Sequence, residues 1–276
     1  MLTEKPLTRS ITLPAGIRLV MLISVDFEGH WDFNYHRGTL PDYYDFYEHH
    51  FDARRGIWRL LEILAKHRIT GTFFTVGAIL EDNKNALKEI EKTGSEIAAH
   101  SYRHEHFYKL TAEQEEGVFQ QMRAAFQDYY GKDVVGFRTC HPNPPRMLET
   151  VVRHGFRYDS SLRDDDTPYI LQREDGSCMV EIPRGANGDA AMIGAPRSIK
   201  YNIPSEAASH WKAEFDRCYQ DGATKIKFFS LCLHSHISGR PSRAKALDGF
   251  LAYVRQFPGV WYATYGEVAD LWLKAT

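Results

Sequence analysis

The feature that most constrains this fold is an alternation of short apolar segments with longer amphipathic ones. Each apolar segment ends in polar residues, and a helical pattern then begins. This unit is repeated about seven times, which predicts parallel strands joined by helices. We therefore expect an α/β protein. Its 276 residues suit one barrel domain, preceded by an arm at residues 1–18 with a short edge strand at 11–16.

The boundaries of these elements follow from periodicity and from turn residues. The expected strands are 19–25, 71–76, 96–100, 134–138, 179–183, 226–233 and 260–264. The expected helices are 53–67, 83–93, 111–130, 146–154, 205–221, 243–256 and 265–273. Thr111 and Gln114 form a predicted capping box at the start of the third helix.

The composition excludes several classes of function. The formal charge is −2 and the isoelectric point about 6.7, whereas a nucleic-acid-binding domain is strongly basic. No apolar run reaches the roughly 18 residues that cross a membrane, and the N-terminus has no apolar signal core. We expect a cytoplasmic protein. No Cys-x-x-Cys occurs. All four cysteines are expected to be reduced thiols, and three of them to fill the core; they are Cys140, Cys178, Cys218 and Cys232.

Two acidic residues follow the first buried strand, at Asp26 and Glu28. Residues two apart on a strand point the same way. Like charges held this close require a cation, a shared proton or open water. The carboxyl ends of parallel strands are also where barrels and open sheets build their sites. The alternative is a solvated turn between strand and loop.

Other strands also end in residues that bind metals or move protons. His100 and His104 are spaced to face one way over one helical turn. Together with a carboxylate they have the composition of a catalytic divalent-metal site, and Zn²⁺ fits it. The alternative is a pair of surface histidines.

The remaining candidates are a general acid, a carboxylate-binding arginine and a loop that can cover the site. His234, at the end of a buried strand, is a candidate general acid that His236 can assist; a structural histidine is the alternative. Arg138 can bind a carboxylate, either a substrate's or that of Asp159. The aromatic loop at 31–50 can cover a pocket or form a subunit interface.

Six motifs in order resemble the polysaccharide deacetylase superfamily, carbohydrate esterase family 4, between about residues 20 and 272. They are Ser24-Val-Asp-Phe-Glu28, Thr72-Phe-Phe-Thr-Val-Gly77, the segment 94–104, Gly136-Phe-Arg138, Tyr158-Asp-Ser-Ser161 and Leu233-His234. Within the superfamily, the segments 165–169, 234–241 and 257–264 resemble the branch with peptidoglycan deacetylase-like proteins, cyclic imidases and allantoinases.

The resemblance implies a distorted (β/α) barrel of about seven parallel strands. It also implies hydrolysis of an amide, usually the N-acetyl group of an amino sugar. Asp26 would be the base and His234 the acid, and Arg138 would hold the base with Asp159 nearby. Glu28, His100 and His104 would bind one divalent metal ion, Zn²⁺ or else Co²⁺ or Mn²⁺. The expected substrate contacts are Trp31, Thr139, Cys140, His141 and His236.

Three departures from the family pattern leave the substrate open. Glu28 replaces the usual aspartate, so it either binds the metal or fills the metal's place. Arg138 is followed by Thr-Cys instead of x-Pro, and 184–195 lacks the expected Trp and paired Asp. A cyclic amidase, with or without a metal, and a non-catalytic binding module therefore remain alternatives to the deacetylase. Relatives in this branch form multimers, so a homo-oligomer is also expected.

Overall fold

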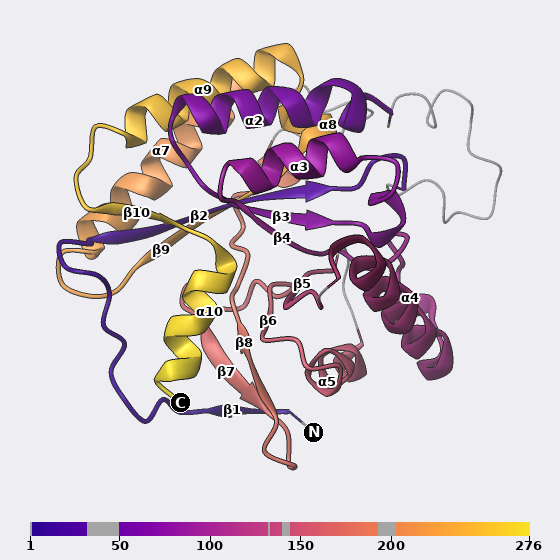
Figure 1. Ribbon diagram of the computed structural model, residues 1–276. Coiled ribbons are helices and arrows are strands. Elements are labelled where there is room, and N and C mark those ends of the chain that lie inside the picture. Colours follow the sequence, from indigo (N-terminus) through magenta and orange to yellow (C-terminus); the bar gives the residue numbers. More distant parts are fainter. Residues whose placement is uncertain (1, 32–49, 132, 140–143, 193–202) are drawn as a thin grey trace.

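The computed structural model describes residues 2–31, 50–131, 133–139, 144–192 and 203–276 (Figure 1). The strands are β1 (Thr3–Lys5), β2 (Leu19–Phe27), β3 (Thr72–Thr75), β4 (Glu96–Ala99), β5 (Gly136–Phe137), β6 (Tyr158–Asp159), β7 (Tyr169–Gln172), β8 (Cys178–Glu181), β9 (Phe228–His234) and β10 (Val260–Ala263). The helices are α2 (Ile57–Lys66), α3 (Lys84–Lys92), α4 (Ala112–Tyr130), α5 (Pro145–Arg153), α6 (Asp189–Met192), α7 (Pro204–Asp221), α8 (Ser235–Ser238), α9 (Pro241–Val254) and α10 (Tyr265–Lys274). One π-helical turn, η2, lies at Asp52–Gly56, and two 3-10 turns, η3 and η4, lie at Gly77–Ile79 and Phe107–Lys109.

The strands form one mostly parallel sheet around β2. Its order is β1-β7-β8-β6-β5-β4-β3-β2-β10, and β9 pairs with the opposite edge of β2. All these pairings are parallel except β1 with β7 and β7 with β8. The predicted α/β class and parallel strands are confirmed. The two antiparallel strands β1 and β7 were not predicted, and the expected edge strand at 11–16 is absent, because β1 at residues 3–5 takes the edge instead.

The sheet curves toward a barrel without closing through backbone hydrogen bonds. No ladder joins β8 and β9 within the part of the chain that the structure describes. The Ser230 hydroxyl of β9 nevertheless donates to the Pro183 carbonyl just after β8, at 3.4 Å. Side-chain contacts therefore bring these two strands together across the seam.

The last helix, α10, fills the interior of the curved sheet. Its buried residues pack against Val20, Phe74 and Val180 of three different strands. Its N-terminus is fixed at the starts of β3 and β4, because the Tyr265 and Gly266 amides donate to Thr72 Oγ1 (2.9 Å) and Glu96 Oε2 (2.8 Å). The carboxyl ends of the strands are left to form the opposite end of the barrel.

Helix ends follow the predicted local chemistry. The Thr111 side chain accepts from the Gln114 amide and the Gln114 side chain accepts from the Thr111 amide, so the predicted capping box at the start of α4 is confirmed. The helix ends at Gly131, whose φ of 66° suits a residue without a Cβ.

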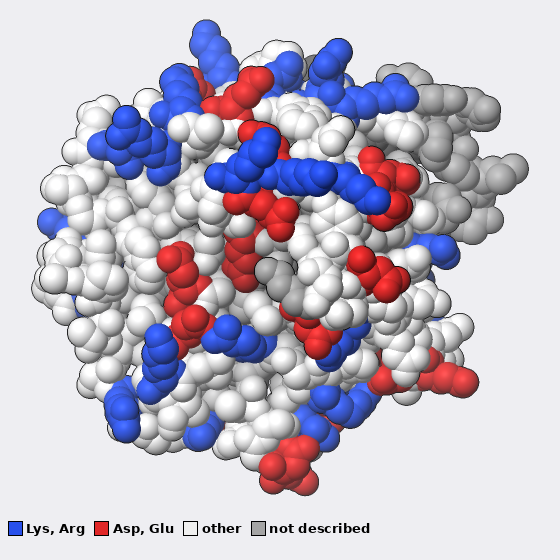
Figure 2. All heavy atoms as spheres, viewed as in Figure 1, with Lys and Arg blue, Asp and Glu red and all other residues white. Residues whose placement is uncertain are grey.

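The distribution of surface charge and the polarity of the helices can be compared with the predictions from composition. Figure 2 shows acidic and basic residues interspersed on the visible face. In the described ranges, every helix is too short or too polar to span a bilayer.

A buried pair of carboxyl groups joins β6 to β8. Asp159 and Glu181 are partners in the strand register, and neither side chain is exposed. Burial, together with the charge of Asp159, raises the pKa of Glu181 well above its usual range. Glu181 is therefore protonated in the fold, and its carboxyl group interacts with that of Asp159. Glu181 Oε1 accepts from the Leu162 amide at 3.0 Å.

This pair predicts that stability falls as pH rises. A protonated Glu181 must release its proton on unfolding above pH 4.5. The free energy of unfolding therefore decreases by about 1.4 kcal/mol per pH unit up to the folded pKa. Glu181→Gln can still accept from the Leu162 amide, and its NH₂ group faces Asp159 without titrating, so the variant gains stability over wild type from pH 5 to pH 7 in urea titrations. Glu174→Gln, at an exposed position, is the control, and identical pH slopes in all three proteins would contradict the shared proton.

Candidate metal centre and active site

The predicted site residues gather at the carboxyl ends of neighbouring strands. Asp26 of β2 and His234 of β9 are partners in the strand register. His100 follows β4, and Arg138 follows β5. Because these strands are parallel and adjacent, residues more than 200 positions apart in the chain come together.

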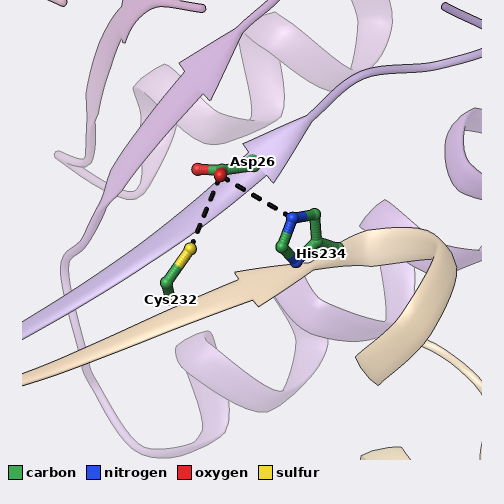
Figure 3. A group of neighbouring side chains, drawn as sticks. All are labelled: Asp26, Cys232 and His234. Carbon is green, nitrogen blue, oxygen red and sulfur yellow. Dashed lines mark hydrogen bonds and ion pairs between the residues drawn. The ribbon is translucent and has the colours of Figure 1, made fainter. Parts of the chain in front are cut away.

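Figure 3 shows how β2 and β9 build the centre of the site. Asp26 points from β2 toward Cys232 and His234, both of which extend from β9. The Cys232 thiol donates to Asp26 Oδ2 at 3.5 Å, and His234 Nε2 lies 3.8 Å from the same oxygen. No role in the site was predicted for Cys232, yet it lies two residues before His234 and so faces the same side of the strand.

Asp26 is held as a buried carboxylate by Arg138. The guanidinium Nη1 lies 2.8 Å from Asp26 Oδ1, and both side chains are buried. Burial alone would raise the pKa of Asp26, but the charge of Arg138, with those of His100 and His234, outweighs burial and holds the pKa well below its usual range. Asp26 is therefore ionised throughout the physiological pH range.

Glu28, His100 and His104 form a compact, buried group of metal-ligand type. Glu28 Oε1 lies 3.1 Å from His104 Nε2 and 3.5 Å from His100 Nε2. Ligand atoms of one tetrahedral Zn²⁺ ion, each about 2.0–2.1 Å from it, are about 3.3–3.4 Å apart. In the described part of the chain His100 Nε2 has no hydrogen-bond partner. The donor set and its spacing therefore fit a divalent ion.

The two histidines are fixed by the loop after β4. His100 Nδ1 lies 2.9 Å from the Arg138 carbonyl oxygen, which directs Nε2 toward Glu28. The spacing of the histidines predicted a helical turn, but the chain instead passes through two left-handed residues, Ser101 (φ 61°) and His104 (φ 60°). Glu105 stabilises this turn by accepting hydrogen bonds from two of its amides.

A second group, Asp26, Cys232 and His234, has metal-ligand side chains within similar reach of one another. Arg138 Nη1, however, lies 2.8 Å from Asp26 Oδ1 and 3.5 Å from Cys232 Sγ. This fixed positive charge opposes a cation. The Glu28 group has no arginine against its ligand atoms in the described ranges, and it is the better metal site.

His234 is oriented by a carboxylate that the sequence did not reveal. Asp189 of α6 is fully buried, and its two oxygens lie 2.7 Å from the His234 ring Nδ1 and backbone amide nitrogen. The Ser238 hydroxyl donates to the same carboxylate. Burial acts to lower the pKa of His234, but Asp189 and Glu28 outweigh it and raise the pKa well above its usual range. His234 is thus a protonated imidazolium with Nε2 toward Asp26.

The other predicted residues lie in different surroundings. Asp159 contacts Ser161 and Glu181; in the described ranges no hydrogen bond or ion pair joins it to Arg138, which instead donates to the Ser160 carbonyl and hydroxyl oxygens. His236 Nδ1 lies 3.9 Å from Glu28 Oε2. Trp31 is half-buried with Arg103 over its ring, and Thr139 is buried after β5. Cys140, His141 and loop residues 32–49 lie outside the described residues.

Comparisons with known proteins point to one family. A family profile described as polysaccharide deacetylase matches residues 45–158. The peptidoglycan deacetylase of Helicobacter pylori is 27% identical over 91% of this chain and 94% of its own length. The chain carries a polysaccharide deacetylase domain. The profile match and this relative support a hydrolase that acts on carbon–nitrogen bonds.

Solved structures support the deacetylase barrel. A Mycobacterium smegmatis protein assigned as a polysaccharide deacetylase superposes with a TM-score of 0.86 and 26% identity, covering 100% of this chain and 97% of its own. The PuuE allantoinase has a TM-score of 0.87 and 22% identity, over 99% and 95% of the two chains, and so shares the fold. The predicted distorted barrel is confirmed, with a sheet that hydrogen bonds leave open.

A further buried carboxyl group, that of Asp52, holds together two turns that carry site residues. Its Oδ2 accepts from the amides of Glu28 (3.1 Å) and Gly29 (2.6 Å), and the Ser235 hydroxyl donates to Oδ1. It therefore links the turn after β2 to the turn after β9. Burial, with a contribution from the Glu28 charge, raises the pKa of Asp52 to about 7. No local pattern marked this residue in the sequence.

The turn that carries Asp52 can approach Ser235 closely because residue 56 is a glycine. A Cβ added to Gly56, at the end of the η turn that begins with Asp52, would come 2.2 Å from the Ser235 carbonyl oxygen. Any other residue at Gly56 would push the turn carrying Asp52 away from α8.

We expect Asp52→Ala to lower the free energy of unfolding by about 2–4 kcal/mol, because two buried amides lose their acceptor. Asp52→Asn should stay within about 1 kcal/mol of wild type, since its oxygen still accepts from the amides and its NH₂ can donate to Ser235. Denaturant titration measures both. Glu89→Ala, which removes an ion pair with the exposed Lys92, is the control with a loss below about 1 kcal/mol. Equal losses for Asp52→Ala and Glu89→Ala would refute this role.

Proposed function

We propose that this protein removes the N-acetyl group from an amino sugar in a polysaccharide or its precursor. The observation that carries the proposal is the juxtaposition of a divalent-metal ligand group with an ionised Asp26 and a protonated His234. An amide hydrolase needs these three functions: an electrophile for the carbonyl, a base for water and an acid for the leaving amine. Family membership supports the same reaction class.

The metal ligands in this proposal are Glu28, His100 and His104. Members of this family generally use a divalent ion. When bound, such an ion polarises the amide carbonyl and lowers the pKa of water to roughly 7. The longer side chain of Glu28, in place of the family's aspartate, is compatible with the ligand separations of 3.1 and 3.5 Å.

Asp26 and His234 carry the proton from water to the leaving group. Asp26 Oδ1 is occupied by Arg138, so Oδ2 is the oxygen that accepts a proton from the attacking water. Because its pKa is low, Asp26 is a weak base and holds this proton only briefly. His234 Nε2 donates the proton that the leaving nitrogen requires, while Asp189 stabilises the imidazolium and fixes its Nδ1–H. Asp26 Oδ2, 3.8 Å from Nε2, can then return a proton to His234.

The substrate in this proposal lies over the strand ends. Trp31, Thr139 and His236, together with Cys140 and His141, are the proposed contacts around the reacting amide. The role of Asp159 in catalysis remains a prediction, and its contacts with Glu181 and Ser161 also support a structural role.

Acetate release from N-acetylated glycans tests the proposal directly. We expect wild type to release acetate from a soluble peptidoglycan fragment or an N-acetylglucosamine oligomer. Asp26→Asn keeps the shape of the side chain and removes the charge, so we expect a loss of kcat of about 10²–10⁴-fold. Thermal unfolding verifies that the variant folds. Wild-type protein that releases no acetate from any N-acetylated glycan would disprove the deacetylase assignment.

If Glu28 binds a metal ion, removing the ion should abolish enzyme activity and adding it back should restore that activity. Chelation should abolish activity, and Zn²⁺, Co²⁺ or Mn²⁺ should restore it. Glu28→Gln should lower metal affinity by at least about 10–100-fold, because a neutral amide is a poor ligand. Metal content after purification without chelators, measured by mass spectrometry, is the readout. Full activity after exhaustive chelation would mean that Glu28 fills the metal's place.

A cyclic amidase is the second candidate, and the fold of the PuuE allantoinase favours testing it. Opening a ring amide needs the same base and acid but releases no acetate. Turnover of allantoin, hydantoins or succinimide, without acetate release from glycans, would select this alternative.

A further inference from the structure

The carboxylate of Asp26 is held at both of its oxygens, by two very different donors. Arg138 Nη1 donates to Oδ1 at 2.8 Å, and the Cys232 thiol donates to Oδ2 at 3.5 Å. Within the part of the chain that the structure describes, this thiol is the one hydrogen-bond donor to Oδ2. The Nε2 atoms of His100 and His234 lie 3.9 and 3.8 Å from the same oxygen, which is too far for a hydrogen bond. Cys232 therefore supplies the second contact that orients Asp26.

The strand register explains how a side chain of β9 reaches this oxygen. Asp26 is the register partner of His234, and Ser24 is the register partner of Cys232. Side chains two apart on a strand share a face, and Figure 3 shows both the thiol and the imidazole turned toward Asp26. The imidazole lies nearer the carboxyl ends of the strands, and the thiol contacts Asp26 from deeper in the barrel.

The direction of the thiol hydrogen follows from the two groups around the sulfur. Arg138 Nη1 lies 3.5 Å from Cys232 Sγ, and a guanidinium group can only donate. The sulfur accepts at that contact, so its own hydrogen is left for Asp26 Oδ2. Burial, together with the charge of Asp26, raises the pKa of Cys232. The group therefore stays a neutral thiol, and a donor, at neutral pH.

A single hydrogen bond does not fix the plane of a carboxylate. Arg138 donates to Oδ1 alone, so the Asp26 carboxylate could turn about that contact and carry Oδ2 away from the attacking water. Small misplacements of a reacting group are costly in rate. A donor on Oδ2 prevents this rotation. Because a thiol is a weak donor, it fixes the oxygen with less loss of basicity than a hydroxyl or an amide would cause.

We propose that Cys232 is a positioning residue, which directs Asp26 Oδ2 toward the water whose proton this oxygen accepts. The inference rests on the proposed deacetylase function, in which Asp26 is the base, and it gives the thiol no contact with substrate. A nucleophilic role would require an accessible thiolate. The side chain of Cys232 is instead buried and faces Asp26.

Cys232→Val tests this role, because it fills nearly the same volume and removes the donor. We expect kcat for acetate release from an N-acetylglucosamine oligomer to fall by about three- to tenfold, as for the loss of one weak hydrogen bond, with KM little changed. The matched control is Cys178→Val. Cys178 is the first residue of β8, at the opposite end of the parallel strands from the site, so this variant should keep the wild-type kcat.

A double-mutant cycle separates positioning of Asp26 from a packing role of Cys232. If the thiol acts through the Asp26 carboxylate, Cys232→Val adds no further loss of kcat to that of Asp26→Asn. A packing defect that also displaced His234 would lower the residual rate of Asp26→Asn as well. Multiplicative losses in the double variant, or a single Cys232→Val variant with full kcat, would overturn the proposal.

Infrared spectroscopy distinguishes failure of this inference from failure of the proposed function. Subtracting the spectrum of Cys232→Val from that of wild type isolates the S–H stretching band of Cys232, whose frequency falls when the thiol donates to a carboxylate. We expect this band to move to higher frequency when the same subtraction is made in the Asp26→Asn background. If wild type releases no acetate from any N-acetylated glycan, the deacetylase proposal fails and the band alone decides. An upward shift supports the contact between thiol and carboxylate, and an unchanged band overturns it.

Discussion

The buried Arg138–Asp26 ion pair is the interaction on which the rest of the structure depends. The guanidinium donates to Ser24, Asp26 and Ser160, and it lies 3.8 Å from the centre of the Phe74 ring. These contacts join β2, β3, β5 and β6. Removing one partner of a buried pair leaves an uncompensated charge, which costs about 3–5 kcal/mol. The group that keeps Asp26 ionised is therefore also the group that holds the barrel's strands in place.

This pair neutralises only part of the negative charge at the strand ends. Glu28 and Asp189 remain as buried carboxyl groups, and four imidazoles lie within 4 Å of Glu28. The remaining negative charge creates two distinct environments within the site. Around Glu28 it favours a divalent cation, and around Asp189 it favours an imidazolium. One side of the site can thus supply an electrophile while the other supplies a proton.

The sequence allowed the convergence of these residues to be predicted, but not the contacts that orient them. Parallel strands must end on one side, so Asp26, Glu28, His100 and His234 could be brought together from their positions alone. Asp52 and Asp189 act through partners 23 and 45 residues away, and no local spacing reveals such contacts. Strands β1 and β7 were missed because antiparallel additions at the end of a sheet do not follow the repeating pattern.

The turn between His100 and His104 has a consequence for how this fold diverges. A non-glycine residue in the left-handed region costs about 1–2 kcal/mol, and the turn holds two of them, Ser101 and His104. A descendant that no longer needed the imidazole could relax His104 to glycine or asparagine and become more stable. In the proposed metal site, the imidazole at this position is therefore kept at a cost in folding stability. In members of the fold that have become purely structural, it is among the first positions at which we would look for the change.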